Sequence, residues 1–165
     1  MTGKILKLQI EVQTILSGKQ CWYVCDGAIG AAFQLALGRK VRRREPLQNR
    51  RLAKAYRDFE GEANLLVWCA WRLDSATRVI SSSQADSSSC HRALSRLKGE
   101  RILSAHASQP AWDLEMIFSN RLRLTLFCDI VPGDDGQSSN YYLTMPDWAF
   151  YAGPGQSYRV ERFDK

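Results

Sequence analysis

Two segments of the chain share one eleven-residue pattern that is typical of antiparallel strands. Residues 59–69 read FEGEANLLVWC and residues 118–128 read FSNRLRLTLFC, with three identities and with apolar residues at matched positions. Alternation of apolar and polar residues places the apolar side chains on one face of a strand. The Leu, Val, Trp and Phe side chains in these segments suit a pleated, half-buried surface. The pattern therefore predicts two sheet-forming segments with the same internal spacing.

The residues around these two segments extend the match and indicate an internal duplication. Each segment follows a region with helical spacing that ends at a glycine, Gly38 in the first half and Gly99 in the second. A polar break and a further apolar run follow each segment. We expect repeat units at residues 26–83 and 87–152, each a short helix followed by a meander of about four antiparallel strands. Chance similarity between two sheet hairpins is the alternative.

The helices of the two units are predicted from their apolar faces and caps. Asp26 can cap a helix that ends near Leu37, and the serine run 87–89 supplies N-cap oxygens for a helix that ends near Leu97. Within the sheet segments, Glu60-Gly61 and Ser119-Asn120 are predicted hairpin turns. The serine-rich segment 81–89 (SSSQADSSS) is the predicted flexible link between the units.

The two ends of the chain complete the predicted fold. Residues 4–25 are expected to form a hairpin, because Ile5 to Ile15 alternate apolar with polar residues and a Ser-Gly-Lys turn follows. A last strand is expected at residues 157–163, after the Gly153-Pro154-Gly155 turn. We therefore predict one α+β domain over residues 1–165, built mainly of antiparallel sheet with two short helices.

Positive charge is concentrated in one part of the chain. The formal net charge is +6, and the segment Arg39–Arg57 has nine basic residues and one acid, Glu45, so it carries +8. The rest of the chain carries −2. A concentrated basic segment of this kind is expected on a surface that binds a polyanion. The candidate binding residues are its arginines: Arg42, Arg43, Arg44, Arg50 and Arg51.

Three interpretations of the basic segment remain open. It is a solvated loop, or it binds an acidic protein, or it binds nucleic acid through phosphates. Tyr56 is its one aromatic residue, so it offers little for base stacking, and no RNA- or DNA-binding motif surrounds it. The acidic protein partner is the first hypothesis among the functional ones, with nucleic acid as the alternative. The sequence does not indicate an oligomeric state.

Tryptophan supplies one further candidate binding residue. Trp68 and Trp71 lie three positions apart, so in one strand their side chains point to opposite faces. One of the pair is expected to be exposed, and an exposed tryptophan can anchor an interface. Trp71 is taken as that anchor.

Motifs for catalysis, metal binding and cofactors are not evident. The chain has no GxGxxG, P-loop, HExxH or GxSxG motif. Nothing local joins Cys128 to His106, and Cys21 and Cys25 lie too far apart along a strand to chelate zinc. No catalytic residue, metal ligand or cofactor is assigned. The second alternative to binding is an enzyme whose acid pair, Glu60 with Glu62 or Asp134 with Asp135, lies in the groove between the repeats.

Cysteine content and the N-terminal residues bear on the compartment. Five cysteines cannot all pair within one chain, and the first residues show no apolar core of a secretory signal. No apolar run is long enough to cross a membrane, so no membrane association is expected. Together these features favour a reducing cytoplasm with free thiols.

The segments FEGEANLLVWCAWRL and WDLEMIFSNRLRLTLFCD resemble small uncharacterised bacterial proteins. These include families encoded beside polymorphic toxins and interpreted as immunity proteins. The resemblance covers roughly residues 90–152, with a weaker counterpart in the first half. It implies a non-enzymatic protein that blocks a partner by steric and electrostatic contact, and it implies no particular site residue.

Overall fold

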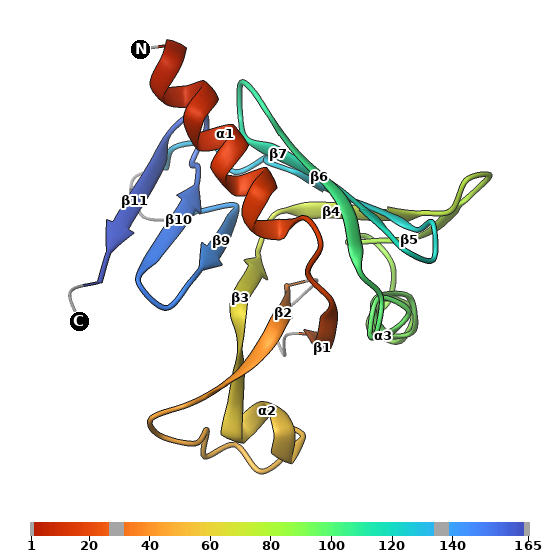
Figure 1. The fold of residues 1–165 in the computed structure, drawn as a ribbon. Helices are drawn as coiled ribbons and strands as arrows, with labels where there is room; N and C mark the ends of the chain where they lie inside the picture. Colours follow the sequence, from red (N-terminus) through yellow and green to blue (C-terminus); the bar gives the residue numbers. More distant parts are fainter. Residues whose placement is uncertain (1, 27–31, 134–138, 164–165) are drawn as a thin grey trace.

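The computed structural model describes residues 2–26, 32–133 and 139–163 and contains two antiparallel sheets (Figure 1). The six-stranded sheet has the strand order β1-β2-β3-β9-β10-β11, and the five-stranded sheet has the order β5-β4-β8-β7-β6. The predicted α+β class, dominated by antiparallel sheet, is therefore confirmed. The strands are β1 (Cys21–Asp26), β2 (Phe33–Arg42), β3 (Phe59–Val67), β4 (Ala70–Asp74), β5 (Val79–Ser82), β6 (Ile102–Ser108), β7 (Asp113–Phe118), β8 (Arg123–Phe127), β9 (Tyr141–Thr144), β10 (Trp148–Ala152) and β11 (Tyr158–Arg162).

Three helices accompany the sheets: α1 (Thr2–Leu16), α2 (Lys54–Asp58) and α3 (Ser87–Ser95). The helix predicted after the serine run is α3, and its buried residues Cys90, Ala93 and Leu94 lie on one face. Its N-cap is Asp86 rather than a serine, because the Asp86 carboxylate accepts a hydrogen bond from the backbone N–H of Ser89 at 2.9 Å. The cap therefore lies at the edge of the predicted serine run.

The predicted hairpin at residues 4–25 is wrong, because its first half is helix α1. Leu8, Val12 and Leu16 follow one another at helical spacing and are all buried. The other apolar positions of the alternating pattern then face outward, and Leu6 and Ile10 are 56% and 53% exposed. Apolar residues of the alternating pattern therefore also form one face of a helix. Packing of this face on the core favours the helix over the strand.

The helix predicted between Asp26 and Leu37 is also wrong where the structure describes it. Residues 27–31 lie outside the described part of the chain, and Phe33 to Leu37 belong to strand β2. Phe33, Leu35 and Leu37 are buried, and β2 pairs with β1 on one side and with β3 on the other. Ala36 points to the opposite face and is buried as well, so the apolar run does not alternate and is hard to distinguish from a helix.

The chain passes between the two sheets at two places. After β3 it turns at Trp68 and Cys69 into β4, and after β8 it leaves Cys128 on the way back to β9. Figure 1 shows the change of direction between β3 and β4. Buried residues of both sheets, α1 and α3 form one contiguous core. The large buried rings Trp71, Trp112 and Tyr141 lie within it.

The internal duplication is not confirmed. Strands from both predicted units are shared between the two sheets, and the first unit has β2 where the second has α3. The predicted link 81–89 is the end of β5, a turn and the first turn of α3 rather than a flexible segment. Glu60-Gly61 lies inside β3 and is not a turn, whereas Ser119-Asn120 is one. The last strand, β11, is where the sequence predicts it.

Candidate functional site

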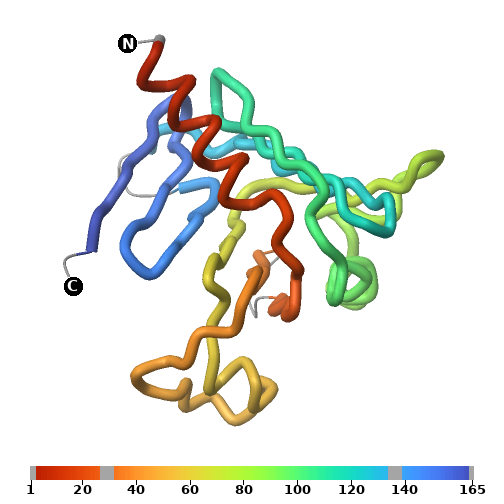
Figure 2. The backbone as a smooth tube through the Cα atoms, viewed as in Figure 1, coloured from red at the N-terminus to blue at the C-terminus, as the bar shows by residue number. Residues whose placement is uncertain are grey.

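The basic segment forms an arm that extends beyond the six-stranded sheet. Strand β1 pairs with β2 no further than Leu37, and β9 pairs with β3 only from Asn64 onward. The rest of β2 and the first half of β3 therefore continue as a two-stranded ribbon (Figures 1 and 2). The loop after β2 and helix α2 close its far end. We call residues 39–60 the basic arm.

A β-bulge marks the base of the arm. Leu37 pairs with Ala63 and Lys40 with Gly61, so β2 carries one extra residue between these two pairs. Gly38 lies in the bulge with φ +75°, and its N–H donates to the carbonyl of Gln20 at 2.8 Å. The sequence predicted that Gly38 ends a helix, but it lies within a strand ladder and interrupts it. Such a bulge increases the twist of the ribbon that follows.

The loop at the far end of the arm is held by its own hydrogen bonds. The N–H of Arg43 donates to the carbonyl of Asp58 at 3.0 Å, and that of Leu47 donates to the carbonyl of Arg57 at 3.0 Å. The Asn49 carboxamide oxygen accepts from the N–H of Arg51 at 3.0 Å. These bonds fix the backbone that carries the arginines, so less conformational entropy is lost on binding than in a disordered loop.

Arg43 differs from the other candidate arginines because its side chain is used inside the arm. Its guanidinium donates to Glu60 Oε2 at 2.9 Å and to the carbonyl of Tyr56 at 3.3 Å, and it lies over the Tyr56 ring at 5.3 Å. Only 15% of the side chain is exposed. Tyr56 itself is buried, and burial raises the pKa of its hydroxyl to about 12. Arg43 therefore stabilises the arm and is not a free binding group.

The other four candidate arginines are exposed on the arm. Arg42 is the last residue of β2, whereas Arg44, Arg50 and Arg51 lie in the loop that follows it. Within the described residues none of the four has an ion-pair partner. Arg42 and Arg44 line a groove of about 680 Å³. The remaining walls of this groove are Val41, Arg43, Glu45, Glu60, Pro146 and Phe163.

Trp71 is not an interface anchor on the monomer, because it is the buried member of the tryptophan pair. Its side chain is 1% exposed and meets Phe33 edge to face at 5.5 Å between ring centroids. Trp68 is 46% exposed. One tryptophan of the pair is exposed, as predicted, but the chosen residue is wrong. Trp68 lies in the turn that follows β3 and Trp71 lies in β4, so the alternation of a single strand could not show which one faces the core.

An aromatic cluster at the arm was missed by the sequence interpretation. Tyr23 stacks on Tyr56 with ring centroids 4.2 Å apart, and Trp22 lies 6.3 Å from Tyr56. Lys40 lies over the Trp22 ring at 5.0 Å. Trp22 and Tyr23 come from β1, which is distant from Tyr56 in sequence. Only the pairing of β1 with β2 brings them to the arm, so no local signal could have found the cluster.

The acid pair Glu60 and Glu62 does not converge on a shared site. Glu60 pairs with Arg43, while Glu62 pairs with Lys19 and accepts from the backbone N–H and Nε of Arg39 at 2.9 and 3.0 Å. The hydrogen bond from Lys19 is the main cause that lowers the pKa of Glu62 to about 2. A general acid needs a raised pKa, so Glu62 is an ion-pair residue. Asp134 and Asp135 lie outside the described residues.

Acid is expected to weaken the base of the arm through Glu62. Since the folded state lowers the pKa of this carboxyl from 4.5 to about 2, its contribution is complete above pH 4.5 and is lost as the pH falls towards 2. We expect wild-type protein to lose about 1–2 kcal/mol more unfolding free energy than Glu62→Gln between about pH 5 and about pH 2.5. Urea unfolding of both proteins across this range measures the difference. Equal losses would contradict the ion-pair role.

The cysteines and histidines do not form a catalytic or metal site in the described residues. Cys128 is not activated, because contact with the Cys69 thiol and burial both raise its pKa. His106 Nδ1 meets Gln13 Nε2 at 3.0 Å instead, and burial raises the pKa of Cys21 to about 12. Within the described ranges, no group of three or more His, Cys, Asp or Glu side chains could hold a metal ion.

The described helices include none with both the length and the apolar character needed to cross a lipid bilayer. Comparisons of this chain with family models, with curated proteins and with solved structures found no match.

Proposed function

We propose that this chain is a non-enzymatic binding protein that uses the basic arm to cover an acidic surface of a protein partner. The observation that carries the proposal is a set of exposed arginines on a protruding element, with no ion-pair partner in the described part of the chain. Arg42, Arg44, Arg50 and Arg51 repel one another on the free arm, and an acidic surface would relieve this repulsion. Complementary charge would mainly raise the association rate and select the partner.

The groove that Arg42 and Arg44 line beside the arm supports a protein partner in particular. Phe163 is exposed and lies with Pro146 beside Arg42 and Arg44 in the lining of this groove. Protein interfaces combine an apolar or aromatic anchor with a charged rim. Such an arrangement suits an acidic protein loop that carries one apolar side chain. It also agrees with the blocking role that the resemblance to immunity-type families implies.

Nucleic acid is the second candidate function. The aromatic cluster favours it, because Trp22 and Tyr23 lie beside arm residues and rings can stack on bases. These rings are already engaged, however, since Tyr56 is buried, Tyr23 stacks on it and Lys40 lies over Trp22. The geometry therefore favours a protein partner over a stacked, single-stranded nucleic acid.

The test compares two variants that remove the same charge from different surfaces. The arm variant changes Arg42, Arg44, Arg50 and Arg51 to Ser and keeps Arg43, which stabilises the arm. The control variant changes four exposed basic residues outside the arm to Ser: Arg78, Arg96, Lys98 and Arg121. Captures from a lysate of the native host, with and without nuclease, identify the partner, and binding is then measured with the purified partner.

We expect the arm variant to bind the purified partner about 100-fold more slowly at low salt, while the control variant stays within about threefold of wild type. The capture should survive nuclease. Equal association rates for the two variants would contradict the proposal. Loss of the captured material on nuclease treatment, with a steep salt dependence of binding, would replace it with the nucleic-acid function.

A further inference from the structure

Three of the four sheet edges have another part of the chain against them. Helix α1 lies along β6, where Gln9 Nε2 donates to the carbonyl of Ala107 at 3.0 Å. At the outer edge of β1, the N–H of Cys21 donates to the carbonyl of Glu100 at 2.8 Å. Helix α3 packs against β5. The fourth edge is β11, and within the described residues its one paired strand is β10.

The hydrogen bonds of β11 show which backbone groups face this open edge. Gly153 N–H donates to Ser157 O at 2.8 Å and Phe163 N–H donates to Asp147 O at 2.9 Å, and the register between these pairs has no bulge. In an antiparallel ladder the hydrogen-bonded pairs alternate. The odd-numbered residues of β11 therefore bond to β10. The backbone groups of Tyr158, Val160 and Arg162 point outward, to the open side.

We propose that β11 pairs antiparallel with β11 of a second copy of this chain, across a two-fold axis at Val160. In this register Val160 faces Val160 of the second copy, and Tyr158 faces Arg162. All three residues with outward backbone groups then meet outward groups of the other copy. The six-stranded sheets of the two copies become one continuous sheet. The inference does not depend on the function proposed for the basic arm.

Charge selects this register among those that the backbone allows. Because outward groups lie on even-numbered residues, the two-fold axis can pass between the strands at residue 159, 160 or 161 with the ladder intact. An axis at Arg159 opposes two arginines, and an axis at Glu161 opposes two glutamates. The axis at Val160 places Arg159 opposite Glu161 twice. These pairs occupy non-hydrogen-bonded positions, where side chains of opposite strands are closest.

Both charged side chains are available for such pairs. Arg159 and Glu161 are 68% and 49% exposed and lie 4.0 Å apart along the same face of β11. Glu161 also accepts a hydrogen bond from the Tyr151 hydroxyl at 3.1 Å, and Arg159 lies over the Tyr151 ring at 4.2 Å. Tyr151 thus holds both side chains on one face of the sheet. Pairing with a second copy would add an opposite charge across the new strand pair.

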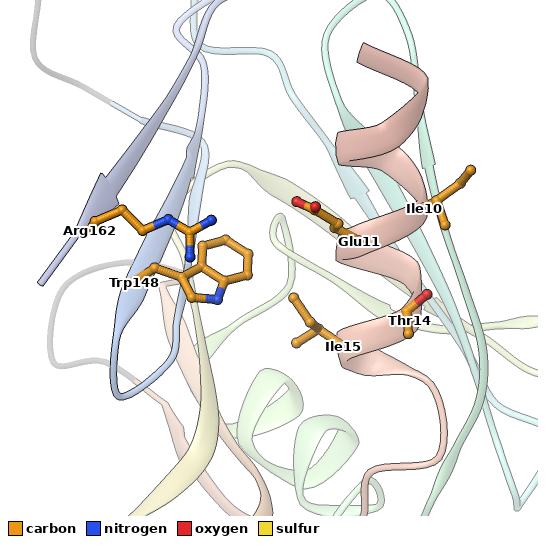
Figure 3. A pocket seen from close by; sticks show the side chains of 6 residues that line it. All are labelled: Ile10, Glu11, Thr14, Ile15, Trp148 and Arg162. Carbon is orange, nitrogen blue, oxygen red and sulfur yellow. The ribbon is translucent and has the colours of Figure 1, made fainter. Parts of the chain in front are cut away.

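The other face of β11 supports the same partner. Between α1 and β11 lie two adjoining grooves of about 300 and 320 Å³, which share Glu11 and Arg162. Figure 3 shows Glu11 pointing from α1 towards Trp148 and Arg162 across one of them. Val160, 39% exposed, lines the other. A two-fold axis perpendicular to the sheet keeps this face of both copies on the same side, so Val160 of the second copy extends the floor of the groove.

Reciprocal charge reversal tests the register directly. Arg159→Glu or Glu161→Arg alone would place two pairs of like charges opposite each other, whereas the double variant restores two opposite-charge pairs. In sedimentation velocity we expect wild-type protein to dimerise between about 1 µM and about 300 µM. Each single variant should raise the dimer dissociation constant about tenfold or more. The dissociation constant of the double variant should lie within about threefold of the wild-type value. Arg78→Glu makes the same charge reversal on the β4–β5 turn and should leave dimerisation unchanged.

Val160→Pro tests the backbone pairing with a different change. Proline removes the outward N–H of Val160, which makes no bond to β10, so the variant should fold and remain monomeric over the same concentrations. Near- and far-ultraviolet circular dichroism checks that it folds. Wild-type protein that stays monomeric throughout, or single and double charge variants that dimerise equally, would overturn the proposal.

Discussion

Replacing Gly61 by alanine is expected to destabilise the protein by about 3–5 kcal/mol, because the added methyl group has no space at the base of the basic arm. A Cβ atom there would lie 2.4 Å from the carbonyl oxygen of Ala63, 2.6 Å from the nitrogen of Leu37 and 2.8 Å from the oxygen of Leu37. All three are backbone atoms of paired strands, so none can rotate away. Relief requires β2 and β3 to separate where the arm leaves the sheet.

The effect is measured by urea unfolding, with Gly3→Ala as the matched control. Gly3 lies in α1, and a Cβ atom there would meet nothing within 4 Å. Because alanine favours helix over glycine, this control should be neutral or stabilising by up to about 1 kcal/mol. A loss below about 1 kcal/mol for Gly61→Ala would show that β2 and β3 are not paired as closely as described. A folded variant that loses partner binding would connect the position of the arm to its proposed function.

The sheet could be predicted from the sequence because its strands are short and half-buried. Segments 59–69 and 118–128 alternate clearly, and most of each is strand, in β3 and in β7 and β8. Periodicity failed where tertiary packing decides between two possible faces. In α1 the same apolar residues fit both a strand face and a helical face, and β2 has buried apolar residues on both faces, since Ala36 is buried as well as Leu35 and Leu37.

The internal match has a structural counterpart, although the duplication is not confirmed. Cys69 and Cys128 end the two matched segments, and each lies where the chain leaves one sheet for the other. Ala70 pairs with Phe127 in the ladder between β4 and β8, so the two cysteines are the next residues opposite each other. Their thiols meet, which contributes to the raised pKa of Cys128. The matched spacing therefore marks the two places where the chain crosses from one sheet to the other.

The candidate site was predictable in its charge but not in its geometry. A count of residues finds the basic segment, yet it cannot distinguish Arg43, which pairs with Glu60, from the exposed Arg42 and Arg44. That distinction arises from the pairing of β2 with β3, which brings together residues 17 positions apart. The groove also depends on residues that are more distant in sequence. Pro146 lies between β9 and β10 and Phe163 follows β11, and in the folded sheet both line the groove with Arg42 and Arg44.

Asn140 connects the two crossovers, and its fit against Gly153 gives the second large prediction. Its carbonyl accepts from the N–H groups of Trp68 and Cys69 at 2.9 and 3.1 Å, and its side-chain oxygen accepts from the N–H of Ile130 at 2.9 Å. The residue is fully buried. Gly153 has φ +85°, and a Cβ atom there would lie 2.2 Å from Asn140 Nδ2.

Gly153→Ala is therefore expected to cost about 3–4 kcal/mol of unfolding free energy, from the left-handed backbone and from displacement of Asn140. Asn140→Ala alone should cost about 2–3 kcal/mol, because it removes a fully buried side chain and the part-buried N–H of Ile130 loses its acceptor. In the Asn140→Ala background the clash is gone, so Gly153→Ala should then cost only about 1 kcal/mol for its backbone conformation. A double-mutant cycle by urea unfolding measures this coupling. Additive losses would mean that glycine is required at position 153 only for its backbone conformation, and that the added methyl group does not displace Asn140.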